Sequence, residues 1–223
     1  MALGRYRNLC IDAVDAGVSG DFWARALGLR VVEHDGESVR LDGPGPRHTV
    51  WINAVADPHI VKNRLHIDVN TESIDALVAA GGTVLDRESF PWTVLADPDG
   101  GELCAFVREA PIHHRLYELV LDCLEPAAQA RWWRGLLGGS LGSEAGADGQ
   151  EYWWLDGIDS APFECVVFAA VPEEKTVRNR VHVDLEGRPE EVEAHGARLV
   201  RIEPDRRVLA DPEGNEFCVY PPR

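Results

Sequence analysis

A six-residue segment of the first half of the chain, "NRLHID" at 63–68, returns as "NRVHVD" at 179–184. The two copies differ only by exchanges among Leu, Ile and Val, which keep the same positions apolar. Polar and apolar residues alternate in both copies, as they do in a β-strand that is buried on one face. A strand of this kind that occurs twice indicates an internal duplication.

Further matches extend the duplication over most of the chain. "LADPD" at 95–99 corresponds to "LADPE" at 209–213, and each is followed by a Gly-x-Glu-x-Cys sequence. Asp-Pro followed by an acidic residue and Gly is typical of a turn between two strands. The chain therefore has two homologous halves, which we assign as domains at 1–110 and 111–223.

Each half is expected to run strand, helix and three strands, twice over. Helices are expected where apolar residues recur at helical spacing before a Gly, and strands where apolar residues alternate between turn residues. In the first half the patterns predict helices at 19–27 and 73–80, and strands at 6–13, 30–34, 38–42, 49–55, 64–70, 83–86, 92–96 and 102–107. Many short strands with a few short helices indicate an α+β protein with largely antiparallel sheets.

Composition narrows the range of partners. The formal net charge of −16 argues against nucleic acid and against an anionic membrane surface, because both would repel the chain. No apolar run reaches the roughly 18 residues of a transmembrane helix, and the N-terminal residues lack the apolar core of a secretory signal. The five cysteines are scattered, which favours reduced thiols over disulfides or a zinc knuckle. We expect a cytoplasmic protein, monomeric or homodimeric, that binds a small molecule.

The sequence resembles the vicinal-oxygen-chelate superfamily, the group of glyoxalase-like, bleomycin-resistance and extradiol-dioxygenase proteins. The resemblance rests on "KNRLHID" at 62–68 and "ADPEGNEFC" at 210–218, and it covers almost the whole chain. It implies tandem glyoxalase-like domains, each of two βαβββ modules that form a curled mixed or antiparallel sheet around a cleft. It also implies that any metal ligands come from cleft-facing positions of the first, fifth and eighth strands.

Strand alternation predicts which side chains face such a cleft. In 64–69 the apolar residues must pack on the core, so His66 and Asp68 face the other side. The same count turns Glu102 and Cys104 towards the cleft in the last strand of the first half. The corresponding residues of the second half are Glu118, Asp122, His182, Asp184, Glu216 and Cys218.

At the ligand positions that the resemblance implies, the second half carries Glu118, His182 and Glu216. One imidazole and two carboxylates suit a divalent ion such as Zn²⁺, Fe²⁺, Mn²⁺ or Ni²⁺. The first half has an Asn at the first position, beside His66 and Glu102. We expect the set in the first half to bind a metal ion more weakly, because an amide is a poor ligand for these ions.

A metal ion in the second half would hold the oxygens of a substrate and stabilise an anion formed from it. A nearby carboxylate would move the proton, and Glu216, Asp184 and Asp122 are the catalytic candidates. These residues predict a metal-dependent lyase, isomerase or dioxygenase that acts on a small oxygenated organic compound.

Four further residues are candidate contacts of an organic ligand. Trp154 alternates with Trp153, so its ring should line the second cleft, where it suits a flat or cationic molecule. Trp92 lies in a short strand near the cleft mouth. Arg180 and Cys218 are expected on the cleft-facing side of their strands.

The residues alone leave two other interpretations open. Arg64, His66 and Asp68 are spaced along one strand face, as are their counterparts in the second half, so each set can form a hydrogen-bonded cluster that braces the sheet. The clefts would then bind an apolar or cationic molecule without metal, as the drug-sequestering members of the superfamily do. The third interpretation is an interaction module with vestigial clefts.

Overall fold

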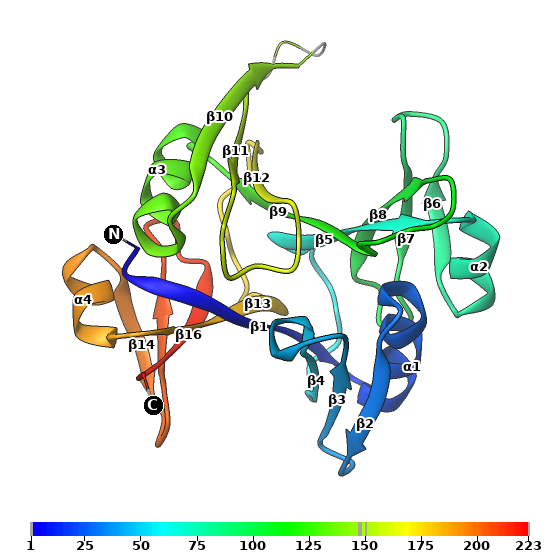
Figure 1. The fold of residues 1–223 in the computed structure, drawn as a ribbon, viewed down its shortest axis with the longest axis horizontal. Helices are drawn as coiled ribbons and strands as arrows, with labels where there is room; N and C mark the ends of the chain where they lie inside the picture. Colours follow the sequence, from blue (N-terminus) through cyan, green and yellow to red (C-terminus); the bar gives the residue numbers. More distant parts are fainter. Residues whose placement is uncertain (1, 147–148, 150, 223) are drawn as a thin grey trace.

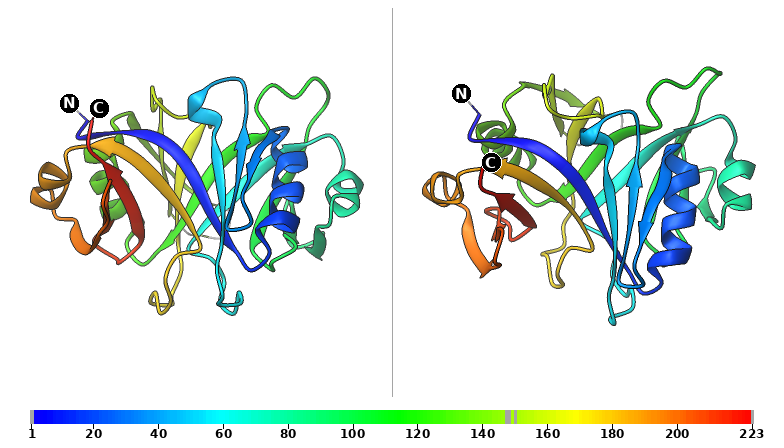
Figure 2. Two further views of the ribbon diagram at one scale, coloured as in Figure 1. Left: turned by 90° about the horizontal axis from the view of Figure 1, so that it is seen from below. Right: turned by 60° about the horizontal axis from the view of Figure 1, so that its bottom comes forward.

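The structure is a computed structural model, and it describes residues 2–146, 149 and 151–222. The strands form two eight-stranded mixed sheets, which we call sheet A and sheet B. Both sheets are curved, and the helices α1 to α4 lie around them (Figures 1 and 2). The fold is the mixed α and β arrangement of curled sheets that the sequence predicts.

Sheet A has the strand order β14-β15-β16-β13-β1-β4-β3-β2, and sheet B has the order β10-β11-β12-β9-β5-β8-β7-β6. The strands of sheet A are β1 (Gly4–Ala13), β2 (Arg30–His34), β3 (Ser38–Asp42), β4 (Val50–Ala54), β13 (Val181–Gly187), β14 (Arg198–Ile202), β15 (Arg207–Ala210) and β16 (Glu216–Tyr220). Those of sheet B are β5 (Leu65–Thr71), β6 (Thr83–Asp86), β7 (Thr93–Ala96), β8 (Glu102–Val107), β9 (Leu116–Cys123), β10 (Ser140–Ala145), β11 (Glu151–Asp156) and β12 (Cys165–Ala170).

The helices are α1 (Ala16–Leu27), α2 (Ile74–Ala79), α3 (Pro126–Leu137) and α4 (Pro189–Ala194), with a 3₁₀ turn at Pro46–His48. Helix α1 begins earlier than predicted because the Asp15 carboxylate accepts a hydrogen bond from the backbone N–H of Val18. It ends where Gly28 takes a left-handed conformation at φ 67°. Among the described residues, no helix has both the length and the apolar character needed to cross a membrane.

Each sheet combines one βαβββ module from each half of the chain. In sheet A, β1 pairs antiparallel with β13; in sheet B, β5 pairs antiparallel with β9. Figure 1 shows β1 and β13 crossing the molecule side by side, and Figure 2 shows the arch that they form. The assignment of residues 1–110 and 111–223 as separate domains stays a prediction, because the strands of each half are divided between the two sheets.

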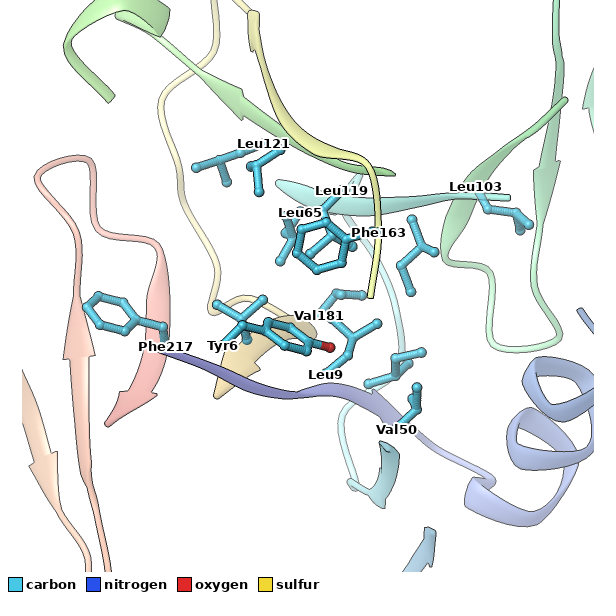
Figure 3. Close-up of a cluster of buried hydrophobic side chains, with 14 of the residues drawn as sticks. Tyr6, Leu9, Val50, Leu65, Leu103, Leu119, Leu121, Phe163, Val181 and Phe217 are labelled. Carbon is cyan, nitrogen blue, oxygen red and sulfur yellow. The ribbon is translucent and has the colours of Figure 1, made fainter. Parts of the chain in front are cut away.

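The hydrophobic core lies between the sheets. Leu9 and Val181 of sheet A approach Leu65 and Leu119 of sheet B, with Phe163 among them (Figure 3). All five side chains are buried. Since alternate residues of a strand point to opposite faces, the polar residues between these apolar ones face away from the core. Each sheet therefore has a polar face, and both candidate sites lie on these faces.

A hydrogen bond between a helix and a turn joins the two modules within each half. The indole N–H of Trp23 in α1 donates to Asp97 in the turn before β8, at 3.0 Å. Trp133 in α3 donates to Asp211 in the equivalent turn before β16, at 3.1 Å. This contact accounts for the repeated Ala-Asp-Pro sequence, because the aspartate holds the turn and the helix together.

Candidate functional site

Titratable side chains from β5, β8 and β9 gather on the polar face of sheet B. Donor atoms of His66, Asp68 and Cys104 all lie within 4.8 Å of one another. Glu118 stands beside them, because it is the register partner of Asp68 across the β5–β9 pair. We call His66, Asp68, Cys104 and Glu118 the sheet B cluster. His66 and Asp68 are only 8% and 4% exposed, although they point away from the core.

Two polar atoms of this cluster lack a well-aligned hydrogen bond. Nδ1 of His66 and Oδ1 of Asp68 lie 3.4 Å apart, and both are buried without a hydrogen-bond partner in the structure. Buried polar atoms without a partner are uncommon in folded proteins, and each calls for an explanation. A bound cation would satisfy the carboxylate oxygen and the ring nitrogen together.

Two carboxylates control the charge of the imidazole. Burial opposes the charged form, but the nearby carboxylates of Asp122 and Asp68 outweigh it and raise the pKa of His66 well above its usual value. Nε2 of His66 lies 3.5 Å from Asp122, which also accepts a hydrogen bond from Lys62. Burial alone would raise the pKa of Asp122, but the hydrogen bond and charge of His66, together with Lys62, outweigh burial and lower that pKa. The raised pKa favours the protonated form of His66 between these two carboxylates.

Glu118 is the more exposed of the two carboxylates of the cluster. Burial raises its pKa to about 7, although the thiol of Cys165 opposes this by donating a hydrogen bond of 3.1 Å. The negative charge of Asp68 raises the pKa further. A carboxyl group that titrates near neutral pH can both accept and donate a proton.

We expect the Glu118→Gln variant to be more stable than the wild-type protein above pH 7 and equally stable below pH 4.5. The folded pKa of about 7 exceeds the ordinary value of 4.5, so the ionised carboxylate destabilises the fold increasingly between these two pH values. The gain is on the order of 1–2 kcal/mol after allowance for solvent screening. Urea unfolding of both proteins at the two ends of this range, with a chelator present, measures it. A difference that does not change with pH would contradict the raised pKa.

Aromatic side chains lie beside the sheet B cluster. Phe106 contacts Trp92 and Tyr117, with ring centroids 5.4 Å and 5.1 Å apart. Phe106 shares its strand face with Cys104, and Tyr117 directly precedes Glu118. Trp154 is on the same face, because its register partner is Val167, which pairs in turn with Val120 of β9.

The polar face of sheet A carries a related set of residues. Sγ of Cys10, a ring nitrogen of His182 and a carboxylate oxygen of Asp184 lie within 4.8 Å of one another. Asn8 donates a hydrogen bond of 2.9 Å to Oδ2 of Asp184, and Oδ1 of Asp184 is buried without a partner. Cys218 is the register partner of Asp184 in β16. Asn8 is the counterpart of Glu118, so no carboxylate stands opposite Asp184 in β1.

The structure does not bring together the metal-ligand set predicted for the second half. Glu118 lies on sheet B, whereas His182 and Glu216 lie on sheet A. The prediction took all three ligands from one half of the chain, but β9 pairs with β5 rather than with β13. The carboxylate of Glu118 therefore joins His66, from the half that seemed the weaker one.

Glu216 and Glu102 hold the segments that precede β13 and β5. Glu216 accepts a hydrogen bond of 3.0 Å from the backbone N–H of Asn179, and its carboxylate lies 2.8 Å from the amine of Lys175. Glu102 accepts a corresponding bond of 3.2 Å from Asn63. Neither belongs to the groups of close donor atoms on the two polar faces. Both carboxylates are thus engaged in local structure.

The arginines of the repeated segment also lie elsewhere than predicted. Arg180 forms an ion pair with Asp99 and donates to the backbone carbonyl of Asp57, and Arg64 donates to the carbonyl of Glu173. Both arginines precede the first residue of their strands, so strand alternation does not govern them. A histidine–carboxylate cluster forms without Arg64.

A large cavity lies between the segments that lead into β5 and β13. It has a volume of about 890 Å³ and is lined mainly by residues 57–64 and 171–180. Asp122 also lines it, so the carboxylate beside His66 reaches the cavity wall. Arg180 lines this cavity as well, whereas Trp92, Trp154 and Cys218 lie on the polar faces.

Sequence reasoning placed His66, Asp68 and Cys104 on one face but did not select Asp68 and Cys104 as ligands. Strand alternation had already turned both towards the cleft, and a thiol beside an imidazole is a recognisable ligand pair. Cys165 and Tyr117 had no such signal. Tyr117 occupies the extra position of a β-bulge in β9, where the register shifts by one residue.

Comparison with known proteins agrees with this architecture. A glyoxalase-like domain model matches residues 8–106 and again residues 118–220. The fold is similar to glyoxalase I from Zea mays, with a TM-score of 0.69, 15% identity, and coverage of 98% of this chain and 92% of that chain. It is also similar to a putative dioxygenase from Bacillus subtilis, with a TM-score of 0.61, 12% identity, and coverage of 99% of this chain and 86% of that one.

No curated protein matches the chain by sequence. At these identities the similar structures establish the fold alone, whereas the family model matches most of the chain in two successive copies. The chain therefore belongs to the glyoxalase-like domain family, and it carries the domain twice.

Proposed function

We propose that the sheet B cluster binds a divalent transition-metal ion and that the protein is a lyase, isomerase or dioxygenase acting on a small oxygenated organic molecule. The observation that carries the proposal is the close approach of His66, Asp68 and Cys104, with Nδ1 and Oδ1 buried and without partners. Nitrogen, oxygen and sulfur donors together suit Zn²⁺ best. Fe²⁺, Mn²⁺ and Ni²⁺ are the other candidate ions.

The donor set fits such an ion. His66, Asp68 and Cys104 would hold it, and Glu118 is close enough in register to Asp68 to complete the set or to remain free. Burial raises the pKa of the Cys104 thiol, so a proton must leave this residue when the ion binds. When bound, the ion would polarise the substrate oxygens and stabilise negative charge that develops on them.

The side chains around the cluster would bind the substrate, transfer a proton and orient the imidazole. The rings of Trp92, Phe106 and Tyr117 offer an apolar surface on which a flat organic molecule can pack. Glu118 is positioned to take up or release a proton beside the cluster. Asp122, which contacts His66 on the far side, orients the imidazole.

Metal content is the test of this proposal. We expect protein purified without a chelator to contain about one equivalent of metal per chain, which the His66→Ala variant loses and the His182→Ala variant keeps. Elemental analysis measures the stoichiometry. A thermal melt of chelated protein with added Zn²⁺ gives a second readout that needs no substrate, because a ligand bound to the folded state raises its stability.

A second candidate function is binding of a small molecule without metal. The carboxylates of Asp68 and Asp122 favour it, since together they neutralise a protonated His66 without any added ion. Wild-type protein that contains no metal and is not stabilised by added Zn²⁺, Fe²⁺, Mn²⁺ or Ni²⁺ would decide for this alternative. If the metal is present, uptake of oxygen during a substrate screen separates a dioxygenase from a lyase or isomerase.

A further inference from the structure

The two polar faces are built from equivalent strands, and at three of the positions where they differ sheet A is the more positive, although Glu186 adds a carboxylate where sheet B has Asn70. Where sheet B carries Tyr117, Glu118 and Trp92, sheet A carries Arg7, Asn8 and Arg206. Each exchange makes sheet A more positive, by adding a guanidinium or by removing a carboxylate. The positions correspond closely, because Arg7, like Tyr117, occupies the extra position of a β-bulge beside the paired strand.

The guanidinium groups of Arg7 and Arg206 lie against one aromatic ring. Cζ of Arg7 is 3.9 Å from the ring centroid of Tyr220, and Cζ of Arg206 is 5.6 Å from it. Arg206 has an ion pair with the exposed side chain of Asp205. Within the described residues, Arg7 has no carboxylate at ion-pair distance, and its stacking on Tyr220 leaves its N–H groups available.

The neighbouring Asp184 supplies an unused acceptor. It is 3% exposed, and its Oδ1 has no hydrogen-bond partner, while Oδ2 accepts from Asn8. A buried carboxylate oxygen of this kind can accept a hydrogen bond from a hydroxyl group. The polar face of sheet A thus combines two cations, a phenol and one acceptor within a few residues.

We propose that this face is a second small-molecule site, and that it takes the carboxylate of a small hydroxy acid. Arg7 and Arg206 would hold the carboxylate, because guanidinium groups bind carboxylates through paired, charge-assisted hydrogen bonds. Oδ1 of Asp184 would accept a hydrogen bond from the hydroxyl group of the acid, and the ring of Tyr220 keeps both arginines in place.

The surrounding charge makes this arrangement unusual for the chain. The protein has a net charge of −16, so an organic anion is repelled from most of its surface. Among the side chains near the two arginines, Asp184 is buried, whereas Glu186 and Asp205 are exposed to solvent. Exposed carboxylates are screened by water and salt, so they oppose an anion at Arg7 less than their number suggests.

Calorimetric titration with mandelate tests the proposal on the full-length protein in the presence of a chelator. A metal ion at Cys10, His182 or Asp184 then cannot supply the affinity, and the outcome does not depend on the metal proposed for sheet B. We expect mandelate to bind with a millimolar or lower Kd, and we expect Arg7→Gln and Arg206→Gln each to weaken it about tenfold or more. Arg7→Lys should weaken it less, because the charge is kept.

The control is Arg131→Gln, which also removes a guanidinium stacked on an aromatic ring, that of Trp153, but one that lies on α3 rather than on sheet A. It should leave the titration unchanged.

Phenylacetate, which lacks the hydroxyl group, should bind more weakly than mandelate to the wild-type protein. The two acids should bind equally well to Asp184→Ala, which removes the acceptor oxygen. The proposal is wrong if wild-type protein binds no mandelate, if the neutral mandelamide binds as tightly, or if the Arg7 and Arg206 variants bind as the wild type does. Phenyl phosphate binding more tightly than mandelate would replace the carboxylate by a phosphate and so overturn the assignment of the ligand class.

Discussion

Replacing Asp97 with Ala is expected to lower the free energy of unfolding by about 3–5 kcal/mol, one of the largest single effects in this chain. Oδ1 of Asp97 accepts hydrogen bonds from the backbone N–H groups of Asp99 and Gly101, at 2.9 Å and 2.8 Å. Oδ2 accepts from the indole of Trp23. Removing the carboxylate leaves three donors without partners at a site where Trp23 is 2% exposed.

Urea unfolding followed by circular dichroism measures this effect. Asp211→Ala should give a similar loss, because Asp211 accepts from Trp133 and from the backbone N–H groups of Glu213 and Asn215. The matched control is Asp86→Ala. Asp86 accepts hydrogen bonds from two backbone N–H groups in an exposed turn. Its replacement should therefore lower the free energy of unfolding by less than about 1 kcal/mol. If Asp97→Ala and Asp86→Ala cost the same, the buried indole bond contributes nothing to stability.

The duplicated aspartate turn shows which parts of the fold can be predicted from sequence. Turn residues, strand alternation and helical spacing are local patterns, so the strands near 38–42 and 102–107 and the turn at Asp97 were located correctly. The αL glycine Gly100, at φ 92°, fits the same local rule. Local signals of this kind determine the elements and the face on which each residue lies.

The pairing of modules could not be predicted in the same way. His66 and His182 stand in sequences so similar that neither pattern shows whether Glu118 faces the first or the second. Packing between segments far apart in the chain decides which strand pairs with β9. The alternation of polar and apolar residues in β9 is the same whether its partner is β5 or β13. The candidate metal set therefore changed from Glu118 with His182 to Glu118 with His66, while strand alternation had already placed His66 and Glu118 on faces that the structure brings together.

The prediction that Arg64 shares a strand face with His66 was wrong for another reason. A count in steps of two holds only inside a strand, and β5 begins one residue after Arg64. The polar partner of Asp122 is Lys62, and the counterpart of that pair in the other half is Arg178 with Asp12. Strand alternation therefore needs a known strand start before it can place a terminal residue.

Two kinds of contact connect the four modules into a closed cycle. Sheet pairing joins the first module to the fourth through β1 and β13, and the second to the third through β5 and β9. The Trp23–Asp97 and Trp133–Asp211 hydrogen bonds join the first module to the second and the third to the fourth. Each half of the chain therefore lacks sheet pairing between its own two modules. It keeps the indole–aspartate bond and a few other contacts, such as the 2.7 Å hydrogen bond from the backbone N–H of Val14 to Asp99.

Residues 1–110, produced alone, are accordingly expected to have no stable monomeric fold. Without the second half, β1 loses β13 and β5 loses β9, so two central strands become sheet edges. The core between the sheets also opens, because Leu9 and Leu65 lose Val181 and Leu119. Burial of a Leu or Val side chain contributes about 1.5–3 kcal/mol, and the loss of several of them exceeds the total stability of a small domain.

Mixing residues 1–110 with residues 111–223 should restore the native fold as a complex of the two fragments, because every strand then regains its partner. A second copy of 1–110 offers a poorer substitute, since its β5 resembles β13 and its β1 resembles β9. Sedimentation and circular dichroism, recorded for each fragment and for the equimolar mixture, distinguish these states. A fragment 1–110 that sediments as a monomer and unfolds cooperatively would show that the half is an independent domain. The contacts between the first and second modules, the Trp23–Asp97 bond among them, would then be sufficient to hold two modules together without their sheet partners.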